Sequence, residues 1–321
     1  MRRTIGAFLI AVAWIAGAHA QGYPARPVSI VVGFTAGGST DIITRLVAED
    51  LRKSWGQPVI VENRPGAGGN IGAANVAKAH PDGYTLLMSS PGPLAINASL
   101  YSNLSYDHLR DFTPVTLVVH VPLVLVVNPR TVSATTFKAF VAEVRANPGK
   151  LFFGSTGTGT SSHLAGELLK VQAGLDMTHV PYKGAVALND VLSGESVQAM
   201  FATIPSVMGH IRAGKLRAIA VTTAKRTAAL PDLLTIAESG YPDFEASSWF
   251  GLVGPRGLPR EIVIRLQTDI ARILAQPEMR EKLTQHGVDP VGNSPEEFGA
   301  YMRAETAKWA KLVKNSGAKA D

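Results

Sequence analysis

The sequence predicts an α/β protein of two lobes that are joined by two crossover segments. Strand and helix patterns alternate along the chain, this alternation occurs twice, and 321 residues suit about two domains at ~150 residues each. The composition, 46% hydrophobic and 17% charged, is that of a globular protein with a substantial core.

The first series starts with a β-rich run, Val28–Val32, and continues with a helix, Ser39–Trp55, whose apolar residues recur at helical spacing and which Gly56 can close. Continuous apolar runs in the strands are typical of buried parallel strands. Two apolar runs, 115–119 and 123–127, are separated by residues 120–122 and mark the expected passage out of the first lobe. The other expected elements are a strand at 59–62, a helix at 71–79, a turn at 81–83 and a strand at 84–88.

The second series resembles the first in architecture, and after it the chain returns through a stretch rich in turn residues, 223–247. We therefore assign 21–122 and 223–321 to lobe I and 123–222 to lobe II, with the ligand site expected in the cleft between them. The expected elements are helices at 137–145, 162–172, 186–192 and 206–213, strands at 151–153, 177–180, 197–201, 216–221 and 249–253, and three final helices at 260–275, 278–285 and 295–314.

Residues 1–20 have the pattern of a secretory signal peptide, and we assign them to a separate signal segment. Arg2 and Arg3 precede an apolar stretch, and a small-x-small site at 18–20 predicts cleavage before Gln21. The apolar stretch is shorter than the ~20 residues of a spanning helix, so we expect no membrane span. The chain has no cysteine, which excludes disulfides, thiolate metal sites and a cysteine nucleophile.

The charge of the chain does not indicate nucleic-acid binding. Loss of the two leader arginines lowers Lys+Arg from 31 to 29 against 25 acidic residues, so the formal charge falls from +6 to +4. The basic residues are scattered and do not interleave with aromatic residues. A small positive excess is compatible with an anionic ligand.

Two loops rich in glycine and hydroxyl residues, 33–41 and 154–163, each follow a strand and precede a helix. Small residues let backbone N–H groups approach a ligand, and a helix N-terminus adds unpaired donors with partial positive charge. One such loop is usually a structural cap. Two of them at matching places in two lobes predict a site that holds a carboxylate without an arginine.

Sequence signals for other chemistries are weak. Neither loop ends in Gly-Lys-Ser/Thr, the third glycine of a dinucleotide motif is absent, and the chain has neither Gly-x-Ser-x-Gly nor His-Glu-x-x-His. The eight histidines lack ligand spacing. We predict no catalytic residue, no metal and no cofactor. Asp41 is expected to offset the helix dipole, and His163 is either a ligand donor or a structural histidine.

Several motifs resemble, in order and over nearly the whole chain, the substrate-binding component of tripartite tricarboxylate transporters, the Bug family of extracytoplasmic solute receptors. They are FTAGGSTD at 34–41, GQPVIVENRPGAGGNIG at 56–72, PDGYTL at 81–86, PYKG at 181–184, PDL at 231–233, AESG at 237–240 and WFG at 249–251.

This resemblance implies a type II periplasmic-binding-protein fold, which closes like a Venus flytrap on an organic acid and delivers it to integral-membrane transporter subunits. Ligands in the family span citrate, other dicarboxylates, acidic amino acids and aromatic acids, and we expect a monomer in the periplasm. Relatives usually carry proline at the position of Gly33 and alanine or proline at that of Thr35. These departures leave the ligand open.

The resemblance also implies that backbone amides and ordered water at 34–41 and 155–163 hold the proximal carboxylate. Strand ends add candidates from the residues alone, because ligands bind at the carboxyl ends of strands in open α/β sheets. Lys183 is a candidate partner for a distal carboxylate or a solvated surface lysine, and 63–69 either approaches the ligand or connects elements beneath the cleft. The predicted ligand-binding residues are Phe34, Thr35, Ala36, Gly37, Gly38, Ser39, Thr40, Asp41, Ser89, Ser90, Ser155, Thr156, Gly157, Thr158, Gly159, Thr160, Ser161, His163, Tyr182, Gly184, Ala202 and Thr203.

Two other functions remain open from the sequence. A ligand-sensing partner of a signalling system would share the fold and differ only in its partner. A hydrolytic enzyme would need a reacting group, for which Ser161 beside His163 is a weak candidate. Trp249 and Phe250 are expected in the core rather than in a site.

Overall fold

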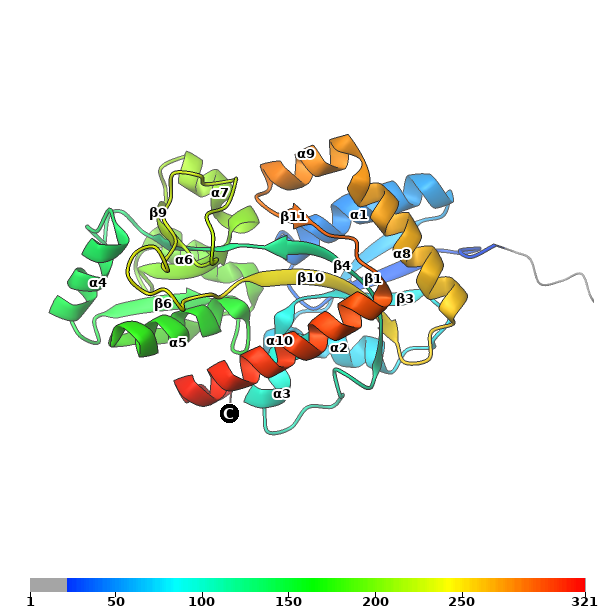
Figure 1. The fold of residues 1–321 in the computed structure, drawn as a ribbon, viewed down its shortest axis with the longest axis horizontal. Coiled ribbons are helices and arrows are strands. Elements are labelled where there is room, and N and C mark those ends of the chain that lie inside the picture. The colour runs from blue at the N-terminus through cyan, green and yellow to red at the C-terminus, as the bar shows by residue number, and fades with distance from the viewer. Residues whose placement is uncertain (1–21, 321) are drawn as a thin grey trace, which may run out of the picture.

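The computed structural model describes residues 22–320, so the signal peptide expected at 1–20 lies outside the described residues. The chain forms two α/β lobes side by side along the long axis of the molecule, each with its own sheet (Figure 1). Within 22–320, none of the helices combines the length and the apolar character needed to cross a bilayer.

The sheet of lobe I has six strands in the order β11-β4-β10-β3-β1-β2. Strand β1 pairs in parallel with β2 and β3, whereas β10 is antiparallel to both β3 and β4. The strands are β1 (Val28–Val32), β2 (Val59–Asn63), β3 (Thr85–Ser89), β4 (Phe112–Val121), β10 (Ser248–Pro255) and β11 (Asp289–Pro290).

The sheet of lobe II has five strands in the order β7-β6-β8-β5-β9. Strand β6 is parallel to β7 and β8, and β5 is antiparallel to β8 and β9. Without the edge strand β11, lobe I has the same order, with β1 in the place of β6 and β10 in the place of β5, so the predicted repeat of architecture is confirmed. The strands are β5 (Leu123–Val127), β6 (Leu151–Ser155), β7 (Met177–Pro181), β8 (Ala199–Thr203) and β9 (Arg217–Val221).

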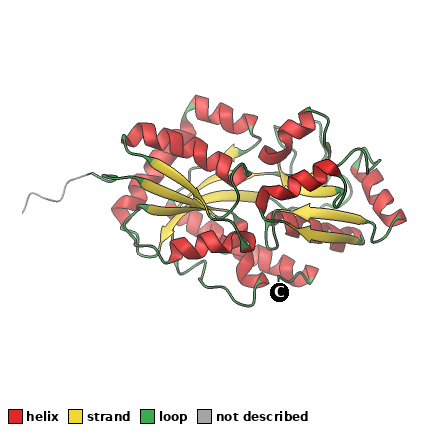
Figure 2. Ribbon diagram, turned by 180° about the vertical axis from the view of Figure 1, so that it is seen from behind, coloured by secondary structure: helices red, strands yellow, loops and turns green. Residues whose placement is uncertain are grey.

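Helices cover both faces of each sheet (Figure 2). The local sequence is enough to predict helix α1. Ile43, Val47 and Leu51 recur every four residues and form its buried face, and Gly56 ends the helix with a φ of 64°. The helices are α1 (Ser39–Trp55), α2 (Asn70–Ala77), α3 (Asn97–Leu100), α4 (Phe137–Ala146), α5 (Ser161–Ala173), α6 (Ala187–Ser193), α7 (Ile204–Arg212), α8 (Arg260–Ala275), α9 (Pro277–Gln285) and α10 (Pro295–Ser316), with the shorter turns η1 (Ala67–Gly69), η2 (Gly92–Ile96) and η3 (Gly184–Val186).

The chain crosses between the lobes twice, and the two crossings lie together. Strands β4 and β10 run side by side through the centre of the molecule (Figure 1), and Val121 pairs with Ser248 at the end of their ladder. Thr222 joins the crossings, because its N–H donates to the Leu123 carbonyl at 3.0 Å and its carbonyl accepts from the Ala246 N–H at 3.0 Å. The exact lobe boundaries remain a prediction.

The apolar core is continuous from one lobe to the other. One cluster of buried side chains contains Leu117 and Trp309 of lobe I together with Leu125 and Phe153 of lobe II. Two further clusters are confined to one lobe each. Trp249 belongs to the shared cluster and Phe250 to the core of lobe I, so the expectation that both are core residues is confirmed.

A buried carboxylate fastens helix α10 to the second crossing. Trp249 Nε1 donates to Glu305 Oε2 at 2.9 Å, and Trp309 Nε1 donates to the same oxygen at 2.8 Å. Glu305 is only 6% exposed, so these indole groups replace most of the water that the carboxylate loses. Helix α10 also packs against α5 of lobe II and so contacts both lobes.

The structure differs from the sequence prediction at several elements, and the turn η1 and the short strand β11 were not expected. Strand β4 extends through His120 and Val121 because both pair with β10, so only Pro122 separates it from β5. Helix α6 is preceded by a separate 3-10 turn, η3. The helical segment η2–α3 was missed, since residues 92–97 are buried all round and show no amphipathic period.

Replacement of Glu305 tests its role as the anchor of α10. Glu305→Ala leaves two buried indole N–H groups without an acceptor, and we expect a loss of about 2–4 kcal/mol in the free energy of unfolding, measured in urea. Glu305→Gln retains an acceptor oxygen and should cost less. The exposed Glu281→Ala in α9 is the control, and equal stability of Glu305→Ala and this control would contradict the role.

Candidate functional site

The crossings determine where the two predicted loops lie. Strand β10 enters lobe I from the crossing and β3 is antiparallel to it, so β3 and its parallel neighbour β1 end at the lobe boundary. Strand β5 likewise leaves the crossing into lobe II, and its antiparallel partner β8, with β6, ends at the same boundary. The β1–α1 and β6–α5 loops therefore both lie between the lobes.

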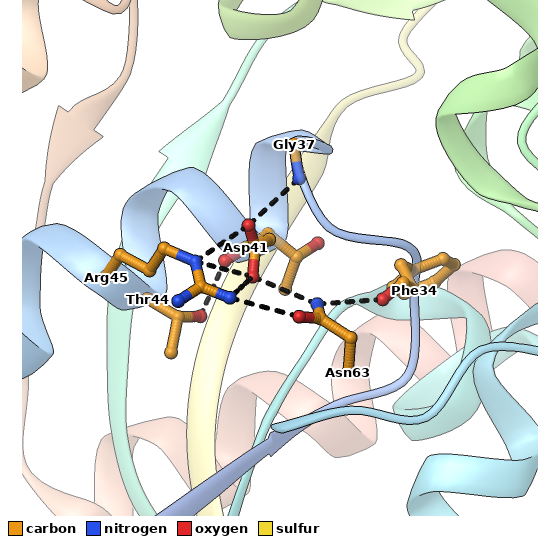
Figure 3. A network of polar contacts seen from close by, with 7 residues as sticks. Phe34, Gly37, Asp41, Thr44, Arg45 and Asn63 are labelled. Carbon is orange, nitrogen blue, oxygen red and sulfur yellow. Dashed lines mark hydrogen bonds and ion pairs between the residues drawn. The ribbon is translucent and has the colours of Figure 1, made fainter. Parts of the chain in front are cut away.

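The β1–α1 loop is held by Asp41, whose buried carboxylate accepts from the Gly37 N–H at 2.9 Å and from Arg45 Nε at 3.0 Å (Figure 3). Asn63, the last residue of β2, donates through Nδ2 to Asp41 at 2.9 Å and to the Phe34 carbonyl at 3.0 Å. Burial acts to raise the pKa of Asp41, but the hydrogen bonds from Arg45, Gly37 and Asn63 hold it below the ordinary value. Asp41 thus shapes the loop as a charged anchor.

The β6–α5 loop is held by neutral groups. Ser155 Oγ lies 2.7 Å from His179 Nε2 and accepts from the Gly157 N–H at 3.2 Å. The Gly159 N–H donates to His163 Nδ1 at 3.3 Å, which places the proton of this imidazole on Nε2. Thr160 caps α5 by accepting from the His163 N–H.

The two imidazoles stack with their centroids 4.0 Å apart. Burial, with a contribution from Lys170, lowers the pKa of His163 to about 4. Burial, the neighbouring His163 and Lys170 lower the pKa of His179 to about 3. Both rings are therefore neutral at pH 7, and this geometry favours the structural role of His163 over that of a ligand donor. His179 is not among the residues predicted from the sequence, because only the pairing of β7 with β6 brings it to the loop.

Glycines allow the lobes to approach closely beside these loops. A Cβ on Gly68 would lie 2.4 Å from the Thr158 carbonyl oxygen, and one on Gly92 would lie 3.1 Å from that of Gly159. Tyr101 Oη donates to the Thr158 carbonyl at 3.2 Å. The Gly-rich stretch 63–69, for which the sequence left two readings open, thus reaches the lobe boundary through its glycines.

A cavity of about 30 Å³ lies at this boundary. Its wall includes Phe34 of the β1–α1 loop, Thr156 of the β6–α5 loop, Tyr182 and Lys183, with the glycines of 66–69 on the side of lobe I. This volume is far below the ~300–1,000 Å³ of typical ligand pockets, so a small-molecule ligand does not fit the cavity at this separation of the lobes.

The predicted site residues fall into three groups. The first group contacts or faces the opposite lobe and consists of Thr35, Ser39, Thr156, Thr158, Gly184 and Thr203. Tyr182 lines the cavity. Ala36 and Gly37 are exposed on the loop between Thr35 and Ser39. The second group is buried. Ser89 and Ser90 lie at the end of β3, and Ala202 packs in the apolar core of lobe II. Thr40 and Ser161 are buried in the first turns of α1 and α5. Six N–H groups of the two loops are already bonded within their own loop, those of Gly37, Gly38, Gly157, Gly159, Thr160 and His163.

Tyr182 is oriented by its own lobe. Its hydroxyl donates to Asp190, and burial together with this hydrogen bond raises the pKa of Tyr182 to about 12. The phenol is therefore protonated at pH 7. Within residues 22–320, no three histidine or carboxylate side chains are grouped so that they could hold a metal ion.

Two repeated α/β lobes around a shared boundary, each presenting a strand–loop–helix turn to it, define the class of two-lobed solute-binding proteins. The sequence pattern of the "Tripartite tricarboxylate transporter family receptor" matches residues 43–318. The protein BugT of Bordetella pertussis is 40% identical over 317 residues, which cover 98% of this chain and 97% of that protein. The chain belongs to this receptor family, as its motifs predict.

Solved structures of relatives have the same fold. The R. palustris protein Rpa4515 with adipate superposes with a TM-score of 0.90 at 40% identity, covering 92% of this chain and 98% of that one. MatC of Rhodopseudomonas palustris with bound malate gives a TM-score of 0.85 at 32% identity, covering 91% and 100%. The periplasmic binding protein BugD gives 0.88 at 38% identity, covering 92% and 99%. The predicted periplasmic-binding-protein fold is confirmed.

Removal of the Asn63 side chain tests the anchor of the first loop. Asn63→Ala deprives the Phe34 carbonyl and the buried Asp41 of a donor, and we expect a loss of about 1–3 kcal/mol in stability. Hydrogen exchange at Gly37 should become faster, because the carboxylate that accepts its N–H loses support. Mass spectrometry of exchange over 34–41 measures this, and the exposed Asn189→Ala is the control. Unchanged exchange in Asn63→Ala would contradict the anchoring.

The two buried histidines predict acid sensitivity. Their folded-state pKa values lie below the ~6.5 of an unfolded chain, so the unfolded state binds more protons and stability is lost as the pH falls from about 6.5 towards 4. Each histidine contributes up to ~1.4 kcal/mol per pH unit in this range. In urea unfolding at pH 7 and pH 5, His179→Gln should lose less stability between the two pH values than the wild type. The exposed His80→Gln should follow the wild type, and a His179→Gln variant with an unreduced loss would refute the assignment.

Proposed function

We propose that this chain is an exported receptor that captures a small organic carboxylate between its lobes and delivers it to a tripartite tricarboxylate-type membrane transporter. The observation that carries the proposal is the juxtaposition of two strand–loop–helix turns, one from each lobe, around one cavity at the lobe boundary. Each turn begins a helix and offers main-chain donors with partial positive charge.

The hydrogen bonds within the loops reduce the number of main-chain N–H groups that we propose as donors to the carboxylate. The N–H groups of Gly37, Gly38, Gly157, Gly159 and Thr160 serve their own loops. We therefore assign the carboxylate to the other N–H groups of 34–41 and 155–161, with Tyr182 and Lys183 beside the distal part of the ligand. The serine and threonine hydroxyls of the two loops, other than those of Thr35 and Ser39, which contact lobe II, are further proposed contacts.

The bound adipate and malate of two relatives support an aliphatic dicarboxylate as the ligand class. The proposed route of access is a separation of the lobes at the two crossings, and the proposed lobes remain 21–122 with 223–321 and 123–222. The proposed setting is the periplasm, after removal of residues 1–20 before Gln21. The proposed receptor is a monomer, and its partners are integral-membrane transporter subunits.

A binding screen tests the ligand class. Adipate and malate, each compared with its diamide, are titrated against the chain from residue 21 onwards by thermal shift and calorimetry. A ligand at 100 times its Kd stabilises the protein by ~2.7 kcal/mol. We expect stabilisation by an acid and none by its diamide, because the amide lacks the charge that the helix N-termini favour. Equal binding of acid and diamide would refute recognition of a carboxylate.

Recovery of the ligand separates a receptor from a hydrolytic enzyme. We expect the wild type to return the acid chemically unchanged, as judged by NMR after long incubation. Ser161→Ala should change affinity by about one hydrogen bond, ~0.5–1.5 kcal/mol. Conversion of the acid that disappears in Ser161→Ala would establish the enzyme instead. Gly159 is unsuited to this test, because an added Cβ would lie 2.1 Å from Asn97 Oδ1.

A further inference from the structure

The β1–α1 loop makes hydrogen bonds to lobe II on both of its sides. Thr35 Oγ1 accepts from the Ala185 N–H at 3.1 Å. Ser39 Oγ lies 2.5 Å from Thr203 Oγ1, close enough for a hydrogen bond in which either hydroxyl donates. The two contacts are four residues apart in lobe I, and between them lies the part of the loop that the proposed function assigns to the carboxylate.

Lobe II has a shape that receives Thr35. Gly184 has φ 72°, and a Cβ at this position would lie 2.5 Å from Thr35 Oγ1. The Gly184 N–H donates to the Thr156 carbonyl at 3.0 Å, which holds the backbone of Gly184 against the β6–α5 loop. The missing side chain of Gly184 therefore leaves room for a hydroxyl from the opposite lobe, and Ala185 supplies the donor.

The partner of Ser39 is equally fixed within lobe II. Thr203 is the last residue of β8, and its carbonyl accepts from Ser206 Oγ at 2.7 Å. Ser206 Oγ also lies 3.2 Å from Thr203 Oγ1. Ser39 itself is buried, so its hydroxyl meets Thr203 largely away from bulk water.

We propose that Thr35 and Ser39 are positioning residues that bond lobe I to lobe II in the closed receptor and thereby set how fast a ligand is released. The proposal rests on the proposed function in one respect, that a ligand leaves through separation of the lobes. Both bonds must be exchanged for bonds to water when the lobes separate. A net hydrogen bond of this kind corresponds to roughly a 2- to 12-fold shift of the equilibrium towards the closed form.

Thr35 allows the more specific test of the two residues. Its hydroxyl is the acceptor, whereas valine at this position would keep the branched shape and lose the acceptor. Thr35→Val thus removes the bond with little change in volume, and Thr35→Ser restores it. The exposed Thr178→Val on the edge strand β7 is the matched control for the same chemical change.

The first experiment measures the lobes without any ligand. Because the chain has no cysteine, spin labels can be attached at Lys53→Cys in α1 and Asn189→Cys in α6, both exposed, and their separation measured by double electron–electron resonance. We expect Thr35→Val and Ser39→Ala each to raise the ratio of open to closed forms by about 2- to 12-fold. Thr35→Ser and Thr178→Val should match the wild type. Unchanged distance distributions in both Thr35→Val and Ser39→Ala would overturn the proposal.

The second experiment measures release of adipate by stopped-flow fluorescence. We expect Thr35→Val to raise the dissociation rate by the factor found for opening, with little change in the association rate, and Thr35→Ser to restore slow release. A changed affinity that lies wholly in the association rate would overturn the role in release. If adipate fails to bind any variant while the distances shift as expected, the lobe contacts stand and adipate is rejected as the ligand.

Discussion

The antiparallel pairing of β4 with β10 is the constraint on which the rest of the molecule depends. These strands carry the chain between the sheets, and their direction makes β1, β3, β6 and β8 end at the lobe boundary. Thr222 bonds to both crossings, so the connections move as one unit instead of sliding past each other. In the proposed opening, the lobes rotate about this joined pair of crossings, as in hinge closure.

The shared core and helix α10 restrict that rotation further. A cluster of buried side chains passes from lobe I to lobe II, and Glu305 fastens α10 to Trp249 at the start of β10. Separation of this apolar surface would expose it to water, at a free-energy cost of roughly 25 cal/mol per Å². The hydroxyl and glycine contacts beside the loops are exchanged for contacts with water at a small net cost in free energy. The proposed opening is therefore at the loops.

The two loops reach similar shapes by different chemistry. The first is anchored by the charged Asp41, which Arg45 and Asn63 keep ionised, and the second by the neutral imidazoles of His163 and His179. In the folded protein an ionised Asp41 and two neutral histidines coexist at neutral pH and down to about pH 4, while acid lowers stability because the unfolded chain gains protons first. Both loops are consequently preorganised around neutral pH, and acid affects the second through its histidines.

The sequence by itself determined the elements whose signals are local: α1 from its four-residue apolar spacing and Gly56, the alternation of strands and helices, and the two loops that precede α1 and α5. Its ordered motifs also identified the receptor family. Only the tertiary structure decided the rest of the candidate site. The glycines of 66–69, His179 and Thr203 reach it from other strands and loops, and the hydrogen bonds within each loop determine which N–H groups are already taken. The physical reason is that periodicity and capping depend on neighbours within a few residues, whereas the approach of two lobes depends on contacts between residues as far apart as Ser39 and Thr203, which no local pattern encodes.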